Sequence, residues 1–372
     1  MSETSIFPIQ ALSAYFKPIL AVSHLWQGKE LHPYIIVNPC SGGFTIKKRS
    51  EVNRTIFSEE AKKAAAKKIL SDVSEITLYK TEYSGHAAFL TQEIIRQAQK
   101  SRASAEILII IAGGDGTCLD VQSALVRFAF ASEENYKLIT SKITVLKLPF
   151  GTGNDGLSGR TLQESLRLLS ENSEFTLAKA VRVKPENINN DYDCFYAFNI
   201  ASIGMDAFIT HKTHKKHEVK PGDFYNFYIN LACLFYSMKY PSDKIKIEVF
   251  DSNGKVKNTI DGKLLFCLLG SSGFRTYGSN NKILPDKRNF CFTPDMSVFK
   301  KFALKKQIKY GRHTEHNFCI LDEVAKIVIH YNNKVLLQMD GEVHALTQKN
   351  FPLTMELTEP VIRTIKLKEN LN

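Results

Sequence analysis

Three glycine-rich turns, each directly after an expected strand, constrain this chain most. They are Asn38–Gly43 (NPCSGG), Gly113–Thr117 (GGDGT) and Gly151–Asp155 (GTGND), and they follow the apolar runs YIIV, ILIIIA and ITVLKLPF. One such turn could equally be a tight connection. In a parallel sheet covered by helices on both faces, however, the carboxyl ends of the strands meet at one edge. Three glycine turns there predict a concave surface of backbone N–H groups that suits phosphate oxygens.

The sequence shows two different patterns of secondary-structure signals, which predict two domains. In the first half, short β-branched runs alternate with helical stretches, as in a doubly wound parallel α/β domain. From about residue 175, strand-like runs follow one another with turn signals between them, as in an antiparallel β-sandwich, with one helix inserted at 224–238. The expected divisions are an N-terminal extension at 1–32, the α/β domain at 33–165, the β-sandwich domain at 166–345, and a C-terminal segment at 346–372 that packs back on the first domain.

The composition of the chain limits the kinds of molecule that it is expected to bind. The 372 residues carry a formal net charge of +11, which favours nucleic acid, phosphorylated ligands or an anionic membrane surface. No zinc-finger, RNP or helix-turn-helix pattern is present, so we expect no nucleic-acid partner. None of the seven cysteines forms a CxxC pair, which argues against a cysteine zinc site and for reduced thiols in the cytoplasm. No apolar run reaches the length of a membrane span, and the N-terminus lacks the basic start of a secretory signal.

Acidic residues stand where phosphate would bind. Asp115 lies inside the second glycine turn and would repel a phosphate unless a divalent metal or a hydroxyl donor lies between them. Asp340 and Glu342 flank Gly341 and point the same way on a strand, which suits a general base beside a metal ligand. A solvated hairpin turn is the alternative for this second pair. The chain has no GxxxxGK[ST] and lacks the motifs of protein kinases.

Taken together, these motifs resemble the diacylglycerol kinase catalytic-domain superfamily, which includes diacylglycerol, sphingosine and ceramide kinases. GGDGT alone is shared with NAD kinases and phosphofructokinases, but the ordered set is specific and spans about residues 33–345. The matching positions are Asn38, Pro39, Ser41 and Gly42; Thr81, Gly85, His86 and Ala87; Gly113–Thr117; Pro149–Asp155; Asn199, Gly204, Asp206 and Ala207; and Asp340, Gly341 and Glu342.

The resemblance implies a two-domain, ATP-dependent lipid kinase whose first domain is similar to that of NAD kinases, with ATP in the cleft between the domains. It assigns catalysis to Asp115, Glu342 and Asp340, with Glu342 as the base, and Mg²⁺ binding to Asp115 and Asp340. It assigns nucleotide binding to Asn38, Ser41, Gly42, Thr81, Gly113, Gly114, Gly116, Thr117, Gly151, Thr152 and Asn154.

The chain also departs from the family pattern. Bacterial members carry a PDA…DDG stretch that binds a structural metal, whereas this chain reads ILPDKRNFCF, which keeps Asp286 but has Arg288 and Asn289 in place of acids. Two basic stretches remain outside the motifs. We interpret HKTHKKH (211–217) as a solvated loop, and KKFALKK (300–306) as a solvated face or a membrane-facing patch.

The sequence therefore predicts a cytoplasmic, peripherally membrane-associated kinase that transfers the γ-phosphate of ATP to the hydroxyl of diacylglycerol or a related lipid. Its expected partners are ATP with Mg²⁺, a lipid with a free hydroxyl and an anionic membrane surface, with a homodimer left open. Two alternatives remain: a kinase of a soluble acceptor such as NAD or a sugar, and a catalytically inactive module that binds lipid or nucleotide.

Overall fold

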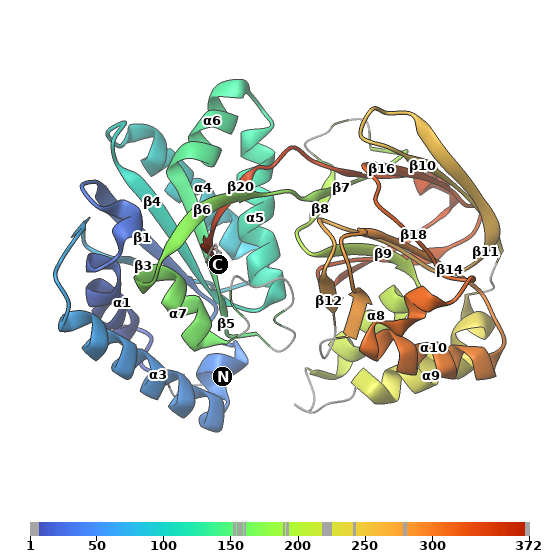
Figure 1. Ribbon diagram of the computed structural model, residues 1–372, viewed down its shortest axis with the longest axis horizontal. Helices are drawn as coiled ribbons and strands as arrows, with labels where there is room; N and C mark the ends of the chain where they lie inside the picture. Colours follow the sequence, from blue (N-terminus) through green and yellow to red (C-terminus); the bar gives the residue numbers. More distant parts are fainter. Residues whose placement is uncertain are drawn as a thin grey trace. The chain divides into compact units, whose positions relative to one another are not determined.

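The computed structural model describes residues 7–151, 154, 159, 161–188, 190, 193–217, 225–240, 243–277 and 281–368 of the chain. The chain forms two compact units (Figure 1). The first comprises Met1–Ala178 with Pro360–Asn372, and the second comprises Lys179–Glu359.

The first unit is a largely parallel sheet with helices on both faces. Its strands are β1 (Glu30–Val37), β2 (Asp72–Val73), β3 (Thr77–Lys80), β4 (Glu106–Gly113), β5 (Ile143–Pro149), β6 (Ser173–Ala178) and β20 (Ile362–Leu367). Its helices are α1 (Ala11–Ala21), η1 (His24–Trp26), α2 (Gly42–Thr45), α3 (Lys47–Ala65), α4 (His86–Lys100), α5 (Asp115–Ala129), α6 (Glu133–Lys142) and α7 (Leu162–Ser170). The sheet order is β2-β1-β4-β5-β20-β6, with β3 also pairing with β1.

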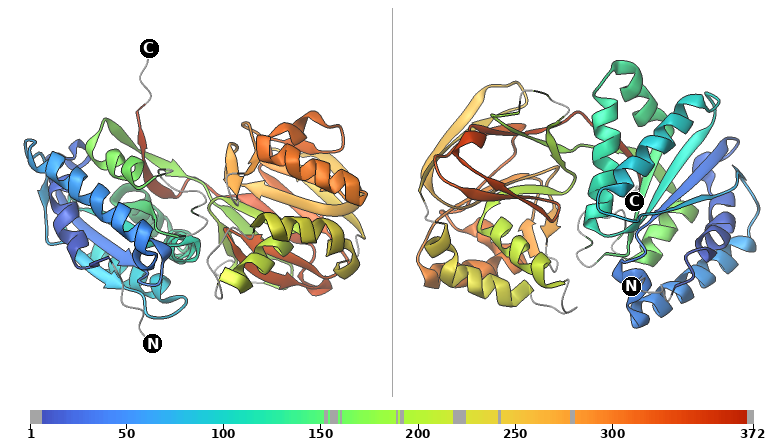
Figure 2. Two further views of the ribbon diagram at one scale, coloured as in Figure 1. Left: turned by 90° about the horizontal axis from the view of Figure 1, so that it is seen from below. Right: turned by 180° about the vertical axis from the view of Figure 1, so that it is seen from behind.

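The order of the strands places a switch point between β1 and β4. Helices α1, α3 and α7 pack on one face of the sheet, and α4, α5 and α6 pack on the other. In the right-hand view of Figure 2, the cyan and teal helices α4 to α6 lie in front of the strands. Because both faces are covered, all eight residues of β4 are buried, which explains its uninterrupted apolar sequence. After β1 the chain passes to one face of the sheet, and after β4 it passes to the other face. Sheets of this kind bind ligands at the carboxyl edge beside such a switch point.

The N-terminal segment is part of the core of this unit. Helix α1 packs on α3, and Phe16 and Trp26 are fully buried. Phe7 makes edge-to-face contacts with Phe44, Phe57 and Phe150 at centroid distances of 5.6, 5.8 and 6.4 Å. Phe44 directly follows the first glycine turn, and Phe150 directly precedes the third. The N-terminal segment therefore packs against residues that adjoin both turns.

The boundaries of the units differ from the expected ones because of strand pairing. Strand β6 pairs antiparallel with β20 along Ser173–Ala178, which keeps residues 166–178 in the first unit. Strand β20 also pairs with β5 at Thr144, so the C-terminal segment returns to the first sheet only from Pro360 onward. Residues 346–359 remain in the second unit because β19 (Leu353–Leu357) pairs with β7 (Val181–Pro185) and β16 (Lys326–His330).

The second unit is antiparallel. Within the described residues an 11-stranded sheet has the order β18-β17-β9-β11-β10-β16-β19-β7-β8, extended by β14 and β15 beside β11. The further strands of this sheet are β8 (Phe195–Ala197), β9 (Ile200–Gly204), β10 (Lys244–Phe250), β11 (Val256–Gly270), β14 (Phe290–Pro294), β15 (Ile320–Asp322), β17 (Val335–Met339) and β18 (Glu342–Leu346). Strands β12 (Arg275–Tyr277) and β13 (Asn281–Leu284) form a separate pair. Two short 3-10 helices are η3 (Arg312–Glu315) and η4 (Gln348–Asn350). The predicted fold class, parallel α/β followed by antiparallel β, is confirmed.

In the described part of this unit three α-helices accompany the sheet, where the sequence predicted one. They are α8 (Met205–His217), α9 (Tyr225–Lys239) and α10 (Val298–Tyr310). The predicted loop at HKTHKKH is wrong, because α8 buries Ala207, Phe208 and Ile209 and its helical turns continue through the basic stretch. KKFALKK lies in α10, which buries Leu304 and Ile308. Among the described residues, none of the helices combines the length and apolar character needed to cross a bilayer.

Candidate active site

The candidate site of the first unit lies where four neighbouring strands end. Asn38 follows β1, Thr81 follows β3, Gly114 follows β4, and Phe150 follows β5. The order β3-β1-β4-β5 brings these ends together at one sheet edge. The backbone N–H of Thr81 donates to the carbonyl of Val37 at 2.8 Å, and that of Asn38 donates to the carbonyl of Ala112 at 3.0 Å, so each turn starts from a paired strand end.

The three glycine turns contact one another directly. The side-chain amide of Asn38 donates to Thr117 Oγ1 at 3.4 Å, which joins the first turn to the second. The backbone N–H of Gly43 donates to the carbonyl of Phe150 at 2.9 Å, which joins the first turn to the third. A Cβ at Gly151 would lie 2.6 Å from the Cα of Gly114, so the second and third turns approach this closely because residue 151 is glycine.

Helix α5 begins inside this set of turns. Gly114 is its N-cap, and Asp115, Gly116 and Thr117 form its first turn. The first N–H groups of a helix lack acceptors within the helix and carry the positive end of its dipole, which makes them ligands for phosphate. Asp115 is half-buried at this point and adds a carboxylate to the anion-binding surface. A carboxylate at this position would repel a phosphate directly, so the arrangement suits a cation that lies between the two groups.

Two further residues constrain the turns. A Cβ at Gly43 would lie 2.3 Å from the buried ring of Phe150, so packing of the first turn tolerates no side chain at that position. Asn154 has φ = 55°, and its buried side-chain oxygen has no hydrogen-bond partner among the described residues. A buried amide acceptor without a partner is costly in a folded protein, so Asn154 is a candidate to bind a hydroxyl or a metal-bound water. Thr152 lies outside the described residues.

Two residues that support these turns were not anticipated from the sequence. Arg49, on α3, donates from Nη2 to the carbonyls of Gly151 at 2.7 Å and Pro149 at 3.3 Å. Asn53, one turn further on, donates to the carbonyl of Gly43 at 3.2 Å. Both act through backbone carbonyls, which every residue carries, so no motif points to them.

The acidic turn of the second unit lies between β17 and β18. Asp340 has φ = 48° and Gly341 has φ = 99°, so both residues adopt left-handed backbone in a tight hairpin. Glu342 is the first residue of β18 and its side chain is exposed. On the same face of β18, His344 stacks near Phe195 at a centroid distance of 4.7 Å. Burial lowers the pKa of His344, and the neighbouring carboxylate of Glu342 acts in the opposite direction.

The carboxylate of Asp340 is engaged by backbone. Its Oδ2 accepts from the N–H of Phe198 at 2.5 Å, and its Oδ1 accepts from the N–H groups of Asn199 and Ile200 at 2.9 Å each. Arg275 lies nearby; burial lowers its pKa and the charge of Asp340 counteracts this. These contacts favour Asp340 as the residue that holds the segment before β9 against the hairpin.

We therefore expect Asp340→Ala to destabilise the protein by about 3 kcal/mol, since three charge-assisted hydrogen bonds disappear and alanine tolerates the left-handed backbone poorly. Asp340→Asn keeps a side-chain oxygen that accepts hydrogen bonds and a residue type that tolerates left-handed backbone, so its loss of stability should be smaller. Urea unfolding of both variants measures this effect. An unchanged unfolding curve together with a raised Mg²⁺ requirement would instead support Asp340 as a metal ligand.

The position of the family's structural metal holds an ion pair in this chain. Arg288 donates to Asp286 from its backbone N at 2.9 Å, from Nε at 2.9 Å and from Nη2 at 2.5 Å. These bonds lower the pKa of Asp286 below its ordinary value of 3.8. Within the described residues, no cluster of three or more His, Cys, Asp and Glu side chains could hold a metal ion.

Arg288→Gln should lower stability at neutral pH by about 1 kcal/mol or less, because both side chains are 37% exposed and water screens the pair. A depressed pKa stabilises the fold above the unfolded-state value and loses that effect as the pH falls through the folded-state value. The difference between wild type and variant should therefore shrink below about pH 3.8. Unfolding curves at neutral and acid pH test this, and a stabilisation by Mg²⁺ that requires Asp286 would contradict it.

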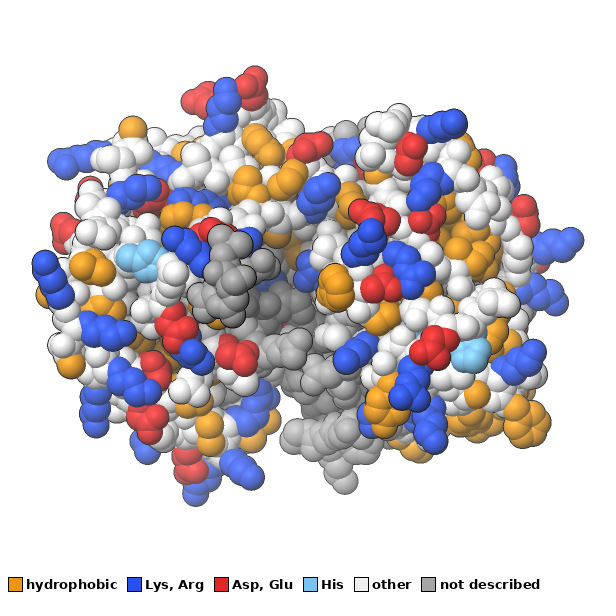
Figure 3. Space-filling view, viewed as in Figure 1, with side chains coloured by type: hydrophobic (Ala, Val, Ile, Leu, Met, Phe, Trp, Pro, Cys, Tyr) orange, Lys and Arg blue, Asp and Glu red, His pale blue; other side chains and the backbone are white. Residues whose placement is uncertain are grey.

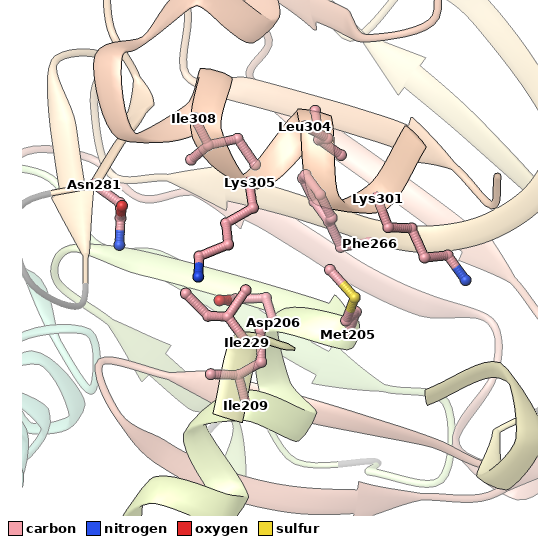
Figure 4. Close-up of a pocket in the computed structure, with 10 residues that line it drawn as sticks. All are labelled: Met205, Asp206, Ile209, Ile229, Phe266, Asn281, Lys301, Leu304, Lys305 and Ile308. Carbon is pink, nitrogen blue, oxygen red and sulfur yellow. The ribbon is translucent and has the colours of Figure 1, made fainter. Parts of the chain in front are cut away.

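An apolar pocket lies in the second unit between the helices and the sheet (Figure 4). It is lined by Met205, Asp206, Ile209, Ile229, Phe266, Asn281, Lys301, Leu304, Lys305 and Ile308. The carboxylate of Asp206 is buried and accepts from the hydroxyl of Ser202 and from Gln338 Nε2 at 3.1 Å. In Figure 4 the ends of Asp206 and Lys305 point toward one another across the pocket. The pocket thus combines apolar walls with a small polar group.

Comparisons with known proteins match both the site and the fold. Residues 32–172 match the family model of the diacylglycerol kinase catalytic domain. A diacylglycerol kinase of Staphylococcus epidermidis is 24% identical over 312 residues, which cover 80% of this chain and 88% of that protein. Among solved structures, a candidate diacylglycerol kinase from Bacillus anthracis strain Sterne has a TM-score of 0.56 at 16% identity, covering 90% of this chain and 96% of that one. A further diacylglycerol kinase structure from the same strain has a TM-score of 0.52 at 15% identity, covering 90% and 96%.

These matches support a phosphotransferase similar to the diacylglycerol kinases. Residues 32–172 of the first unit are similar to the diacylglycerol kinase catalytic domain, and the resemblance to that superfamily recognised from the sequence is confirmed. The family-model match spans the first four of the six motifs and the helix α7 that follows them, and ends within the first unit.

Proposed function

We propose that this protein is an ATP-dependent lipid kinase that transfers the γ-phosphate to the hydroxyl of diacylglycerol or a related lipid. The observation that carries the proposal is the direct contact of three glycine turns around the start of α5. Such a surface offers backbone N–H groups to phosphate oxygens without side chains in the way. Kinase chemistry depends mainly on positioning and on charge neutralisation, which this surface supplies.

In this proposal the first unit binds the nucleotide. Asn38, Ser41 and Thr81 lie at the ends of β1 and β3, and the turn Gly113–Thr117 opens α5. Backbone N–H groups of Gly114, Gly116 and Thr117 would contact the phosphates. Asn154, with its buried free oxygen, would lie at the transfer point.

Mg²⁺ fits the same surface because Asp115 presents a carboxylate beside the expected phosphates, and Mg²⁺ commonly binds through one or two carboxylates together with phosphate oxygens. When bound, the ion would neutralise charge on the transferring phosphoryl group. Of the two predicted metal ligands, we retain Asp115 as the stronger, since both oxygens of Asp340 accept backbone N–H groups.

For the transfer step we propose Glu342 as the general base. Its exposed carboxylate would take the proton of the lipid hydroxyl as the hydroxyl oxygen forms a bond to the γ-phosphorus. The bond between the γ-phosphorus and its bridging oxygen breaks, and ADP leaves with that oxygen. Asp340 acts as a positioning residue, because it fixes the hairpin that starts at β17 and carries Glu342.

The pocket between α8, α9 and α10 is our candidate for the hydrocarbon part of the acceptor, since its lining is mainly apolar. We propose the cytoplasm as the compartment, where ATP is available and the seven cysteines, none of which forms a disulfide in the structure, would stay reduced.

The test is phosphate transfer from labelled ATP with Mg²⁺ to lipids in mixed micelles, with the products separated. The panel contains diacylglycerol, monoacylglycerol, sphingosine and ceramide, with NAD and a hexose as soluble acceptors. A labelled lipid supports the proposal and identifies the acceptor. Label on a soluble acceptor alone would replace the lipid by that acceptor, and ATP binding without any labelled product would favour a binding module.

A further inference from the structure

Helix α9 has apolar side chains on its exposed side. Phe227, Leu234 and Met238 recur at helical spacing and are 57, 47 and 78% exposed, and Phe235 beside them is 48% exposed. The opposite side of the helix, including Tyr228, is apolar too and packs in the core of the second unit. A surface helix usually presents a polar stripe to water. Nothing in the fold of this unit requires the outer stripe of α9 to be apolar.

Helix α10 adds aromatic side chains and lysines to the same surface. Phe299 is 88% exposed, Tyr310 is 59% exposed, and Val298 and Phe302 are each 37% exposed. Lys300, Lys306 and Lys309 are exposed as well, and neither α9 nor α10 contains an acidic residue. These two helices hold nearly half of the large hydrophobic side chains that are exposed in the described part of the chain.

Polar contacts hold the two helices side by side. Lys305 Nζ donates to Asn230 Oδ1 at 2.8 Å, and Lys301 Nζ donates to Ser237 Oγ at 2.7 Å. Lys301 is buried and pairs with Asp295 at 2.7 Å, so its charge is neutralised within the unit. The helices therefore form one surface, which we call the α9–α10 face: Phe227, Leu234, Phe235, Met238, Val298, Phe299, Phe302 and Tyr310, with Lys239, Lys300, Lys306 and Lys309. Figure 3 shows hydrophobic and basic side chains together along the lower edge of this unit, where Figure 1 places both helices.

We propose that the α9–α10 face docks on an anionic lipid bilayer. Exposed aromatic and aliphatic side chains would enter the interfacial region, and the lysines around them would attract anionic headgroups while their stems cover apolar surface. A second copy of the chain is a poorer occupant. A two-fold contact would bring this face against itself, lysines against lysines with no acid on either helix.

Docking through the α9–α10 face would bring the apolar pocket close to the bilayer, a point that rests on the proposed function. Ile229 of α9 and Lys301, Leu304, Lys305 and Ile308 of α10 line the apolar pocket from the inner side of the same helices. A lipid acceptor resides in a bilayer, so helices that touch the bilayer on one side and the pocket on the other shorten its transfer.

The test is flotation of the full chain with vesicles of phosphatidylcholine alone or mixed with phosphatidylglycerol, without ATP or acceptor. We expect binding to the mixed vesicles only, weakened by salt. Phe299→Ala with Met238→Ala should weaken that binding by about tenfold or more. Lys306→Ala with Lys309→Ala should weaken it by roughly twentyfold, since each lysine near an anionic surface contributes about fivefold.

Matched controls use exposed residues elsewhere. Val52→Ala with Ile69→Ala removes apolar side chains that are 50 and 71% exposed in the first unit, and Lys62→Ala with Lys68→Ala removes exposed lysines there. Both controls should bind as wild type, and thermal unfolding should show that every variant is folded. Wild-type binding by both α9–α10 variants overturns the proposal. So does a dimer in sedimentation velocity that Phe299→Ala with Met238→Ala dissociates while vesicle binding is unchanged.

Failure of this inference and failure of the proposed function are distinguishable. Lipid phosphorylation in detergent micelles without vesicle binding would reject only the docking face. Vesicle binding that depends on the face, without phosphorylation of any lipid, would reject only the lipid kinase.

Discussion

Asp115→Asn is expected to lower kcat for phosphoryl transfer by about a thousandfold, the size of loss typical when a group that stabilises transition-state charge is removed. The substitution removes a negative charge from the start of α5, where it would otherwise hold a cation against the phosphates, and it keeps the shape of the side chain. Initial rates across a range of Mg²⁺ concentrations measure the loss, and circular dichroism and thermal unfolding check the fold.

The control for Asp115 is Glu134→Gln, which removes an acid from the first turn of α6, away from the glycine turns. It should leave the rate unchanged. An Asp115→Asn enzyme with a near-normal rate would remove Asp115 from the catalytic assignment, whether or not it binds ATP more tightly.

Glu342→Gln is expected to lower kcat by between about a hundredfold and ten thousandfold, the range for loss of a general base. Glutamine is isosteric and cannot accept the proton. Glu342 is exposed at the start of β18, so stability should change little. Because a base contributes only once it is deprotonated, the residual activity should lose its dependence on a low-pH ionisation. The measurement is a pH–rate profile of both enzymes with the acceptor identified by the lipid panel.

Glu323→Gln is a matched control for Glu342, since Glu323 is an exposed glutamate of the same unit next to β15. It should behave as wild type. If Glu342→Gln kept full activity with an unchanged pH profile, the base would have to be sought elsewhere, and the DGE turn would be a structural hairpin.

The sequence predicted the parts of this protein that local patterns encode. The glycine turns follow apolar strands, and parallel strands gather their carboxyl ends, so the convergence of Asn38, Gly114 and Gly151 could be anticipated. A Cβ at Gly151 would lie 2.6 Å from the Cα of Gly114, which shows how closely the second and third turns approach. The role of each site residue in catalysis remains a prediction.

Other features depend on contacts between residues distant in the sequence. The carboxylate of Asp340 accepts from N–H groups about 140 residues earlier in the chain, which spacing within the DGE motif cannot show. Arg49 supports the third turn through carbonyls, which have no sequence signature. Helix α8 was missed because its lysines and histidines resemble a solvated loop, and KKFALKK of α10 was interpreted only as a solvated face or a membrane-facing patch. Packing of Phe208 and Leu304 in the core determines that both segments are helical.

Strand β20 has a consequence for how this protein is made. Its residues Ile362–Leu367 pair along β6 and meet β5 at Thr144, and Arg363 donates to Glu106 Oε2 at 2.6 Å and to the carbonyl of Ser141. During synthesis on the ribosome, β5 and β6 emerge about 210 and about 180 residues before the strand that joins them. The first unit, although encoded mostly first, therefore cannot finish folding until the second unit has been translated. A nascent chain stalled before Pro360 would expose an unpaired sheet edge, a site for chaperone binding or aggregation.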